Sequence, residues 1–434
     1  ASVVLGLGLA LSSCDAMMKD AKKKEDSGHG INLNYMDTSV SPKEDFYRYV
    51  NGTWLDETEI PADRTRWGGF DMLRKDTDAT VLDILQNAGK SGKYAADSDQ
   101  GKALLLYDSF MDTKARDNAG VKPLKKALGI IDGINSVKDL QEAVAKHGTI
   151  VRQPFFGLAA FSNPNNSAIN SAYVAVGSLG LPDKDYYILD DEKMQDIREK
   201  YVAHVARMLQ FIGDDANQAK KNAEAILAFE TRLVTPRYDK VESRDFRNYN
   251  NPHSVAELQT LVPSIDWAKF LTDIGVDKEP ETLLVMQPKY MKELNTILQE
   301  GDVSLWKTIM RWNLINGAAS SLSTEIDKAN WDLYSKTLSG AEQQRPLKER
   351  ALAAVNGIVG EAVGQLYVDQ KFPKEAKEKA EVMIDDVIEA FKNRIQDLDW
   401  MGAETKVKAV EKLNKFTVKI GYPDKWKDYS DLEI

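Results

Sequence analysis

With 434 residues, the chain is long enough for two or more ordinary domains and for a large hydrophobic core. Its hydrophobic content of 43% and charged content of 29% are typical of a globular protein and exclude a disordered or membrane-embedded chain. The net charge of −10, without a long basic stripe, argues against nucleic-acid binding. The single cysteine excludes an internal disulfide framework and a cysteine-based metal site.

The first thirteen residues are small or apolar and lead directly into Cys14, after which the sequence becomes polar. This run is shorter than the ~20 apolar residues of a transmembrane helix, and it has the length of the apolar part of a signal peptide. The sequence Leu11-Ser12-Ser13-Cys14 resembles a bacterial lipobox, in which the signal is cut before a cysteine that receives a diacylglycerol. The alternative is an ordinary buried thiol in a terminal helix.

On the lipobox interpretation, residues 1–13 are a signal peptide without its basic start, and residues 14–37 are the lipidated cysteine and a charged, flexible tether. A lipid on Cys14 would hold the protein on a membrane surface. The sequence therefore predicts a protein of the bacterial cell envelope, anchored outside the cytoplasm in the periplasm or at the cell surface.

Helical patterns dominate from residue 39 onward. In the segment 41–52, Ser41 is expected to cap a helix, Glu44 to complete a capping box and Gly52 to end the helix. The same pattern, a serine cap followed by an amphipathic run, predicts helices that begin after Ser136, with an end at Gly148, and after Ser254.

Two arginines, Arg66 and Arg74, lie eight positions apart in the segment TRWGGFDMLRKD (65–76). Arginine is rarely buried without an anionic partner. That partner could be an internal carboxylate such as Asp71, or a carboxylate brought by a ligand. The residues alone favour the internal pair, because arginine forms ion pairs in many contexts. The aromatic residues of this region are expected to serve packing: Trp54, Trp67 and Phe70.

Strand character is confined to 150–161 and 171–179, which are rich in β-branched and aromatic residues and flank the turn-rich segment SNPNNSAIN. These segments predict a small β-hairpin inserted into a mainly α-helical protein. Longer amphipathic helices, with apolar stripes expected to face the core, are predicted over 193–212, 217–234, 347–368 and 374–398. The stripe of the last helix consists of Ala376, Ala380, Met383, Val387, Phe391, Ile395 and Leu398.

The residues alone contain no recognisable catalytic apparatus. The sequence has no HExxH motif, no GxSxG elbow and no phosphate-binding loop. Each of its four histidines has an ordinary structural interpretation, because a metal site needs several converging ligands. These histidines are His29, His147, His204 and His253.

Five ordered stretches resemble the neprilysin and endothelin-converting-enzyme family of zinc metallopeptidases. They read DFYRYVNGTWLDETEIPADRTRWGGFDML (45–73), LGLPDKDYYILDD (179–191), RNYNNPHSVAELQTLVPSIDW (247–267), VGEAVGQLYVDQKFP (359–373) and LDWMGAETKVKAVEKLNKFTVKIGYPDKW (398–426). Cysteines common in the animal members' first stretch are absent here, so the chain looks similar to the bacterial PepO-type oligopeptidases.

The resemblance implies that residues 38–432 form the N-terminal peptidase domain, most of a helical cap lobe in a two-lobed chamber enzyme. In this family the HExxH helix and the other zinc ligands come later than position 434, so no catalytic or metal residue is expected in this chain. The cofactor implied is zinc, bound beyond Ile434. The implied partners are short peptide substrates and the chain's own zinc lobe.

The family's first stretch carries two arginines at this spacing that contact the carboxylate end of the peptide. The resemblance maps them onto Arg66 and Arg74, with Asp71 as an orienting carboxylate. It thus implies the substrate chamber of an envelope-anchored zinc endopeptidase, with this chain alone inactive. The alternative is a non-catalytic helical lipoprotein that acts as a peptide-binding or interaction module.

Overall fold

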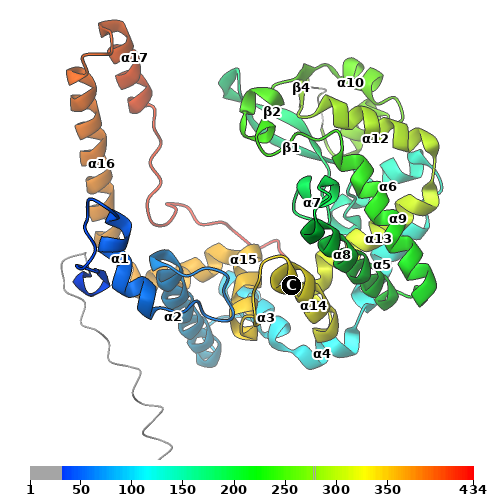
Figure 1. Cartoon of the computed structure of the whole chain (residues 1–434), viewed down its shortest axis with the longest axis horizontal. Coiled ribbons are helices and arrows are strands. Elements are labelled where there is room, and N and C mark those ends of the chain that lie inside the picture. Colours follow the sequence, from blue (N-terminus) through cyan, green and yellow to red (C-terminus); the bar gives the residue numbers. More distant parts are fainter. Residues whose placement is uncertain (1–31, 277, 279) are drawn as a thin grey trace, which may run out of the picture. The chain divides into compact units, whose positions relative to one another are not determined.

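The computed structural model describes residues 32–276, 278 and 280–434 (Figure 1). These residues divide into two compact units, with the boundary between Pro61 and Ala62. The expected mainly α-helical fold with a small β-hairpin is confirmed. Cys14 and the predicted signal peptide lie outside the described residues.

The first unit contains a short 3-10 turn, η1 (Leu33–Tyr35), and helix α1 (Phe46–Glu57). Asp45, not Ser41, caps α1, because its carboxylate accepts a 2.8 Å hydrogen bond from the Arg48 amide. The predicted stop at Gly52 is also wrong. Gly52 lies inside α1, where a Cβ atom would come within 2.5 Å of the Asp37 Cβ, so glycine permits this close approach.

The second unit contains the remaining helices. Their bounds are α2 (Gly69–Ser91), α3 (Asp99–Met111), α4 (Thr113–Ala119), α5 (Lys125–Asp132), α6 (Val137–Val151), α7 (Asp185–Ile188), α8 (Glu192–Phe211), α9 (Ala216–Val234), α10 (Val255–Leu261), α11 (Trp267–Asp273), α12 (Pro288–Glu300), α13 (Val303–Ala318), α14 (Thr324–Trp331), α15 (Leu347–Lys371), α16 (Lys374–Asp397) and α17 (Ala403–Asn414). A π-helical segment, η6 (Asp332–Thr337), continues α14. The helices predicted over 193–212, 217–234, 347–368 and 374–398 are confirmed as α8, α9, α15 and α16.

Two of the predicted serine caps are confirmed. Ser254 forms a complete capping box with Glu257 at the start of α10. Ser136 caps α6, but this helix does not end at Gly148. It continues to Val151 through a kink at His147, where φ is −134°.

The hairpin consists of strands β1 (Phe156–Asn163) and β2 (Asn166–Val176), paired antiparallel. Its turn is much shorter than the predicted segment, because the Asn163 side chain accepts hydrogen bonds from two of the following backbone amides. The hairpin belongs to a four-stranded sheet of order β1-β2-β4-β3, where β4 (Leu283–Val285) runs parallel to β2 and β3 (Pro252–His253) antiparallel to β4. The last two strands are too short to show an alternating pattern in the sequence.

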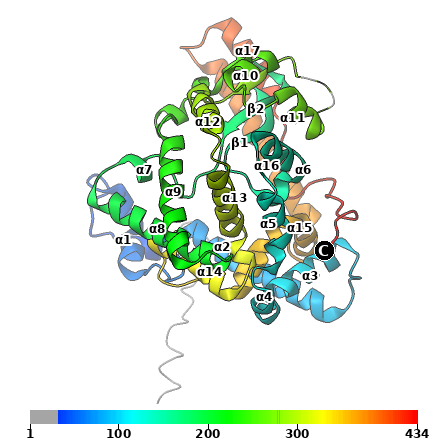
Figure 2. The same cartoon turned by 90° about the vertical axis from the view of Figure 1, so that its right-hand side faces the viewer.

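Two hydrophobic clusters fill this unit. The larger one surrounds α13, with α8 and α9 on one side and α5 and α6 on the other (Figure 2). The smaller one joins α2, α3 and α15. By length and composition α15 could cross a membrane, but its residues Ala351, Leu352 and Val355 are buried against α2 and α3. It is therefore a core helix of this unit.

The apolar stripe of α16 does not face a core within the described residues. Met383, Val387 and Phe391 are exposed, with 59%, 45% and 56% of their surfaces accessible. The periodicity predicted the helix correctly, but it cannot tell which surface covers the apolar face. The prediction that this stripe is buried is wrong for these three residues.

A buried polar network lies beneath the segment that contains Gly180 and Tyr187. The Glu230 carboxylate accepts hydrogen bonds from Tyr201 (2.7 Å), Tyr187 (2.9 Å) and the Gly180 amide (3.1 Å). Burial raises the pKa of Glu230 to about 7. Tyr334 completes the network by donating a 2.9 Å hydrogen bond to the Gly180 carbonyl, so this segment is held from both sides.

Candidate functional site

A cavity of about 440 Å³ opens in the second unit, between the segment before α2 and the segment before α15. The end of α14 and the π-helical segment η6 form a further wall. Its lining is polar and rich in arginine: Asp63, Arg64, Thr65, Arg66, Asp71, Trp331, Ser335, Ser339, Ala341, Gln343, Gln344, Arg345 and Arg350.

Arg66 and Asp71 lie side by side on this cavity. Asp71 is in the first turn of α2, where a carboxylate interacts favourably with the helix N-terminus. Its Oδ1 atom is 3.3 Å from the Nε atom of Arg66, whose side chain is 85% exposed. The pair leaves most of the guanidinium open to solvent, so Arg66 can still receive an anion.

Arg64 fixes the segment of the chain that carries Arg66. Its side chain is only 12% exposed and donates a 2.8 Å hydrogen bond to Glu349 in the first turn of α15. In addition, the amides of Glu342 and Gln343 both donate 2.9 Å hydrogen bonds to the Ala62 carbonyl. The two segments that line the cavity are therefore joined to each other directly.

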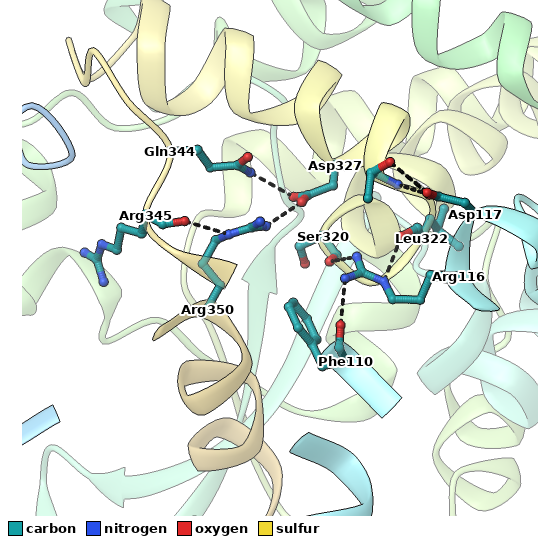
Figure 3. A network of polar contacts seen from close by, with 10 residues as sticks. Phe110, Arg116, Asp117, Ser320, Leu322, Asp327, Gln344, Arg345 and Arg350 are labelled. Carbon is teal, nitrogen blue, oxygen red and sulfur yellow. Dashed lines mark hydrogen bonds and ion pairs between the residues drawn. The ribbon is translucent and has the colours of Figure 1, made fainter. Parts of the chain in front are cut away.

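The segment before α15, which forms the other side of the cavity, is held in place by Asp327 on α14. This buried carboxylate forms an ion pair with Arg350 and accepts a 3.3 Å hydrogen bond from Gln344 (Figure 3). Arg350 also donates to the Arg345 carbonyl at 3.1 Å. Asp327 thereby fixes the chain on both sides of Arg345.

Helix α14 is in turn anchored by two neighbouring residues of α4. The Asp117 carboxylate caps α14 from outside by accepting a 2.7 Å hydrogen bond from the Thr324 amide, and this bond lowers the pKa of Asp117. Arg116 donates to the carbonyls of Ser320 (2.7 Å) and Leu322 (3.0 Å) (Figure 3). Burial lowers the pKa of Arg116, although an arginine stays charged.

The structure places two of the three predicted site residues, Arg66 and Asp71, on the cavity. Arg74 is not among the lining residues. It lies one turn further along α2 with its side chain 75% exposed, and its Nε atom is 3.4 Å from the Asp78 carboxylate. The assignment of these residues to substrate binding stays a prediction.

Of the aromatic residues expected to serve packing, Phe70 is 91% exposed, so the expectation is wrong for this residue. The buried residues of α2 begin only at Leu82, and its first turns lie at the surface. Trp67 is half-buried beneath the Lys75 ammonium, 5.5 Å from the ring centroid. Trp54 packs on Tyr35 within the first unit.

The sequence did not single out the second wall of the cavity, which is formed by Trp331, Ser335, Ser339, Ala341, Gln343, Gln344 and Arg345. These residues lie far from Arg66 in the chain and meet it only through the fold. One weak indication of this wall is present in the sequence QQRP (343–346). A residue before a proline favours extended backbone, so Arg345 is expected to lie in a connecting segment and not in the helix that follows.

In residues 32–276, 278 and 280–434, no group of three or more His, Cys, Asp or Glu side chains is placed to hold a metal ion. His204 is buried between Trp312 and Tyr334, and burial lowers its pKa to about 4. The His253 ring lies 3.0 Å from the Asn251 carbonyl. The described residues therefore do not fit a zinc site.

Residues 42–423 match the family model described as peptidase family M13. Mouse endothelin-converting enzyme 1 is 28% identical over 415 residues, covering 92% of this chain and 53% of that protein. Mouse neprilysin is 29% identical over 424 residues, covering 90% of this chain and 55% of that protein. The chain thus spans about half the length of these relatives.

Among solved structures, the zinc metalloprotease Zmp1 of Mycobacterium tuberculosis, in complex with an inhibitor, superposes with a TM-score of 0.84 at 34% identity. The match covers 93% of this chain and 61% of Zmp1. PepO from Lactobacillus rhamnosis has the same fold, with a TM-score of 0.79 at 20% identity over 90% of this chain and 61% of PepO. The family match, these relatives and the shared fold lead to one conclusion: the chain belongs to peptidase family M13 and comprises its N-terminal domain.

Proposed function

We propose that this chain forms the peptide-binding portion of a zinc endopeptidase that cleaves short peptides. One observation carries the proposal. The exposed guanidinium of Arg66 lies on a cavity of about 440 Å³, with Asp71 positioned to orient it. The family is one of zinc-dependent metallopeptidases, and that supports this reading of the cavity.

Arg66 is proposed to bind the C-terminal carboxylate of the peptide. A guanidinium matches a carboxylate with two parallel hydrogen bonds and keeps its charge at every physiological pH. Arg74 is proposed as a second, weaker contact, since it already pairs with Asp78 and lies outside the cavity lining. The substrates are therefore short peptides with a free C-terminus.

The catalytic residues and the zinc ligands are proposed to lie outside this chain, which alone should hydrolyse nothing. The chain spans about half the length of its relatives, and this fact supports the proposal. The exposed apolar residues of α16, Met383, Val387 and Phe391, supply a surface that a further lobe would cover.

The protein is proposed to act at the bacterial cell envelope, attached through a lipid on Cys14. The support is the lipobox-like sequence Leu11-Ser12-Ser13-Cys14. The measurement is incorporation of a labelled fatty acid by cells that express the protein with its native leader. Replacement of Cys14 by serine should abolish the label, and a labelled Cys14→Ser variant would contradict the anchor.

Binding of matched peptides to this chain tests the proposed function. A short peptide with a free C-terminus should bind at least about tenfold more tightly than its C-terminal amide, since hydrogen bonds to charged groups contribute ~1.5–3 kcal/mol each. Arg66→Ala should remove most of this difference and leave amide binding unchanged. Equal affinity of acid and amide for the unmodified chain would disprove the carboxylate anchor.

A further inference from the structure

Four arginines line the Arg66 cavity, and three of them have an acidic partner in the second unit. Arg64 pairs with Asp63 and Glu349, Arg66 with Asp71, and Arg350 with Asp327. The fourth is Arg345, at the end of the segment before α15.

In the part of the chain that the structure describes, the Arg345 side chain has no ion pair. The two acids that line the cavity, Asp63 and Asp71, face Arg64 and Arg66. The side chain of Arg345 is exposed and directed away from the Asp327–Arg350 pair (Figure 3). It therefore gives the cavity a positive charge that forms no ion pair with an acid of the described residues.

The backbone that carries Arg345 is fixed on both sides. Before it, Gln343 donates to the Ala62 carbonyl and Gln344 to the Asp327 carboxylate. After it, Pro346 restricts the backbone of Arg345 to extended conformations, and the Arg350 guanidinium holds its carbonyl. A guanidinium on such a fixed base loses less conformational entropy on binding than one on a mobile loop.

We propose that Arg345 is a second anion contact in this cavity, which receives an acidic side chain from the last three residues of the bound peptide. The inference rests on the proposed function, in which Arg66 binds the C-terminal carboxylate. A guanidinium is suited to the carboxylate of glutamate or aspartate by geometry and charge. The side chains of Gln343 and Ser339, on the same cavity, can donate further hydrogen bonds to the same group.

The net charge of the chain makes this contact consequential. A chain of net charge −10 repels an acidic peptide at long range, so local cations must offset that repulsion. Arg66 is already partly neutralised by Asp71, which leaves Arg345 as the residue that can distinguish acidic peptides from neutral ones.

Four acetylated pentapeptides test the inference by equilibrium binding to this chain at low ionic strength. Two carry glutamate at the last three positions and two carry glutamine there, each as free acid and as C-terminal amide. The free acid with glutamate should bind about tenfold more tightly than the free acid with glutamine. Arg345→Gln should remove this preference, and Arg345→Lys should restore part of it.

Lys348→Gln is the matched control, because it removes an exposed positive charge nearby on α15 that does not line the cavity. It should keep the glutamate preference. If Arg345→Gln also keeps that preference, or the unmodified chain has none, the role of Arg345 is disproved while the Arg66 anchor stands. If the acids and amides bind equally, the proposed function itself fails.

Discussion

Tyr201 and Glu230 form a 2.7 Å hydrogen bond with both side chains buried, 0% and 3% exposed. Burial is the main reason that the pKa of Glu230 rises to about 7, and the same cause raises the pKa of Tyr201 above its ordinary value. The segment around Gly180 therefore depends on a carboxyl group that titrates close to neutral pH.

Glu230→Gln should change how stability depends on pH. The folded value of about 7 lies above the ordinary value of 4.5, so the unfolded chain loses this proton first as the pH rises. The stabilisation is complete below pH 4.5 and is lost as the pH rises to about 7. It amounts to at most roughly 3 kcal/mol. The free energy of unfolding of the variant, measured in urea across this range, should lack that loss.

Glu224→Gln is the control for this experiment, because Glu224 is an exposed glutamate on the same helix, α9. Its pH profile should follow that of the unmodified chain. If Glu230→Gln also follows that profile, Glu230 does not titrate differently in the folded and unfolded states.

His204→Phe should reveal the opposite trend. Burial lowers the pKa of His204 to about 4 from 6.5, so the unfolded chain takes up this proton first as the pH falls. The associated stability is present above pH 6.5 and is lost toward pH 4, again at most roughly 3 kcal/mol. Relative to the unmodified chain, the variant should lose less unfolding free energy between pH 6.5 and 4. Identical slopes in urea titrations would contradict a buried neutral histidine.

Gly180→Ala should destabilise the second unit. A Cβ atom at this position would lie 1.8 Å from the Tyr201 hydroxyl, which would have to leave Glu230. We expect a loss of roughly 2–4 kcal/mol in unfolding free energy, since a buried carboxyl group would lose a hydrogen bond and the core would be overpacked.

Gly129→Ala provides the comparison, because no atom outside the surrounding helix α5 lies within 4 Å of a Cβ atom there. Inside a helix this change should stabilise by ~0.5–1 kcal/mol. A Gly180→Ala variant as stable as the unmodified chain would show that the Tyr201 ring can move without penalty.

Arg74→Ala should weaken binding of a free-acid peptide less than Arg66→Ala does. Arg74 is 75% exposed, pairs with Asp78 and lies outside the cavity lining, so its contribution should stay below about fivefold in affinity. Titrations of both variants with the same peptide acid and amide measure the difference. Equal losses would assign the two arginines equal roles, as the family resemblance implies.

The helices that the sequence located best are those whose apolar spacing and caps agree. The helix predicted over 193–212 is α8 (Glu192–Phe211). The predicted cap Ser254 forms a capping box with Glu257 at the start of α10. Strand β4 escaped detection because three residues carry too little pattern. The apolar spacing of α16 predicts a stripe that faces a core, and this prediction fails because periodicity indicates an apolar face but not the surface that covers it.

The candidate site was predictable only where its residues are neighbours in the chain. Arg66 and Asp71 lie five positions apart, so their pairing could be anticipated. Arg345 reaches the same cavity only through the fold, because the amides of Glu342 and Gln343 donate to the Ala62 carbonyl and Gln344 donates to Asp327 on α14. No local pattern encodes that approach.

The parallel pairing of β2 with β4 also has a consequence for the order of events during synthesis. Val174 pairs with Val285, and all of α7 to α11 lies between them in the sequence. During synthesis, β1 and β2 therefore leave the ribosome long before β4 does. Until β4 is available, the edge of β2 that pairs with it has no partner. Such an edge readily pairs with other chains. The nascent chain is thus most open to aggregation in the interval before residue 285 emerges, and non-local pairing of this kind makes the second unit slow to complete its fold.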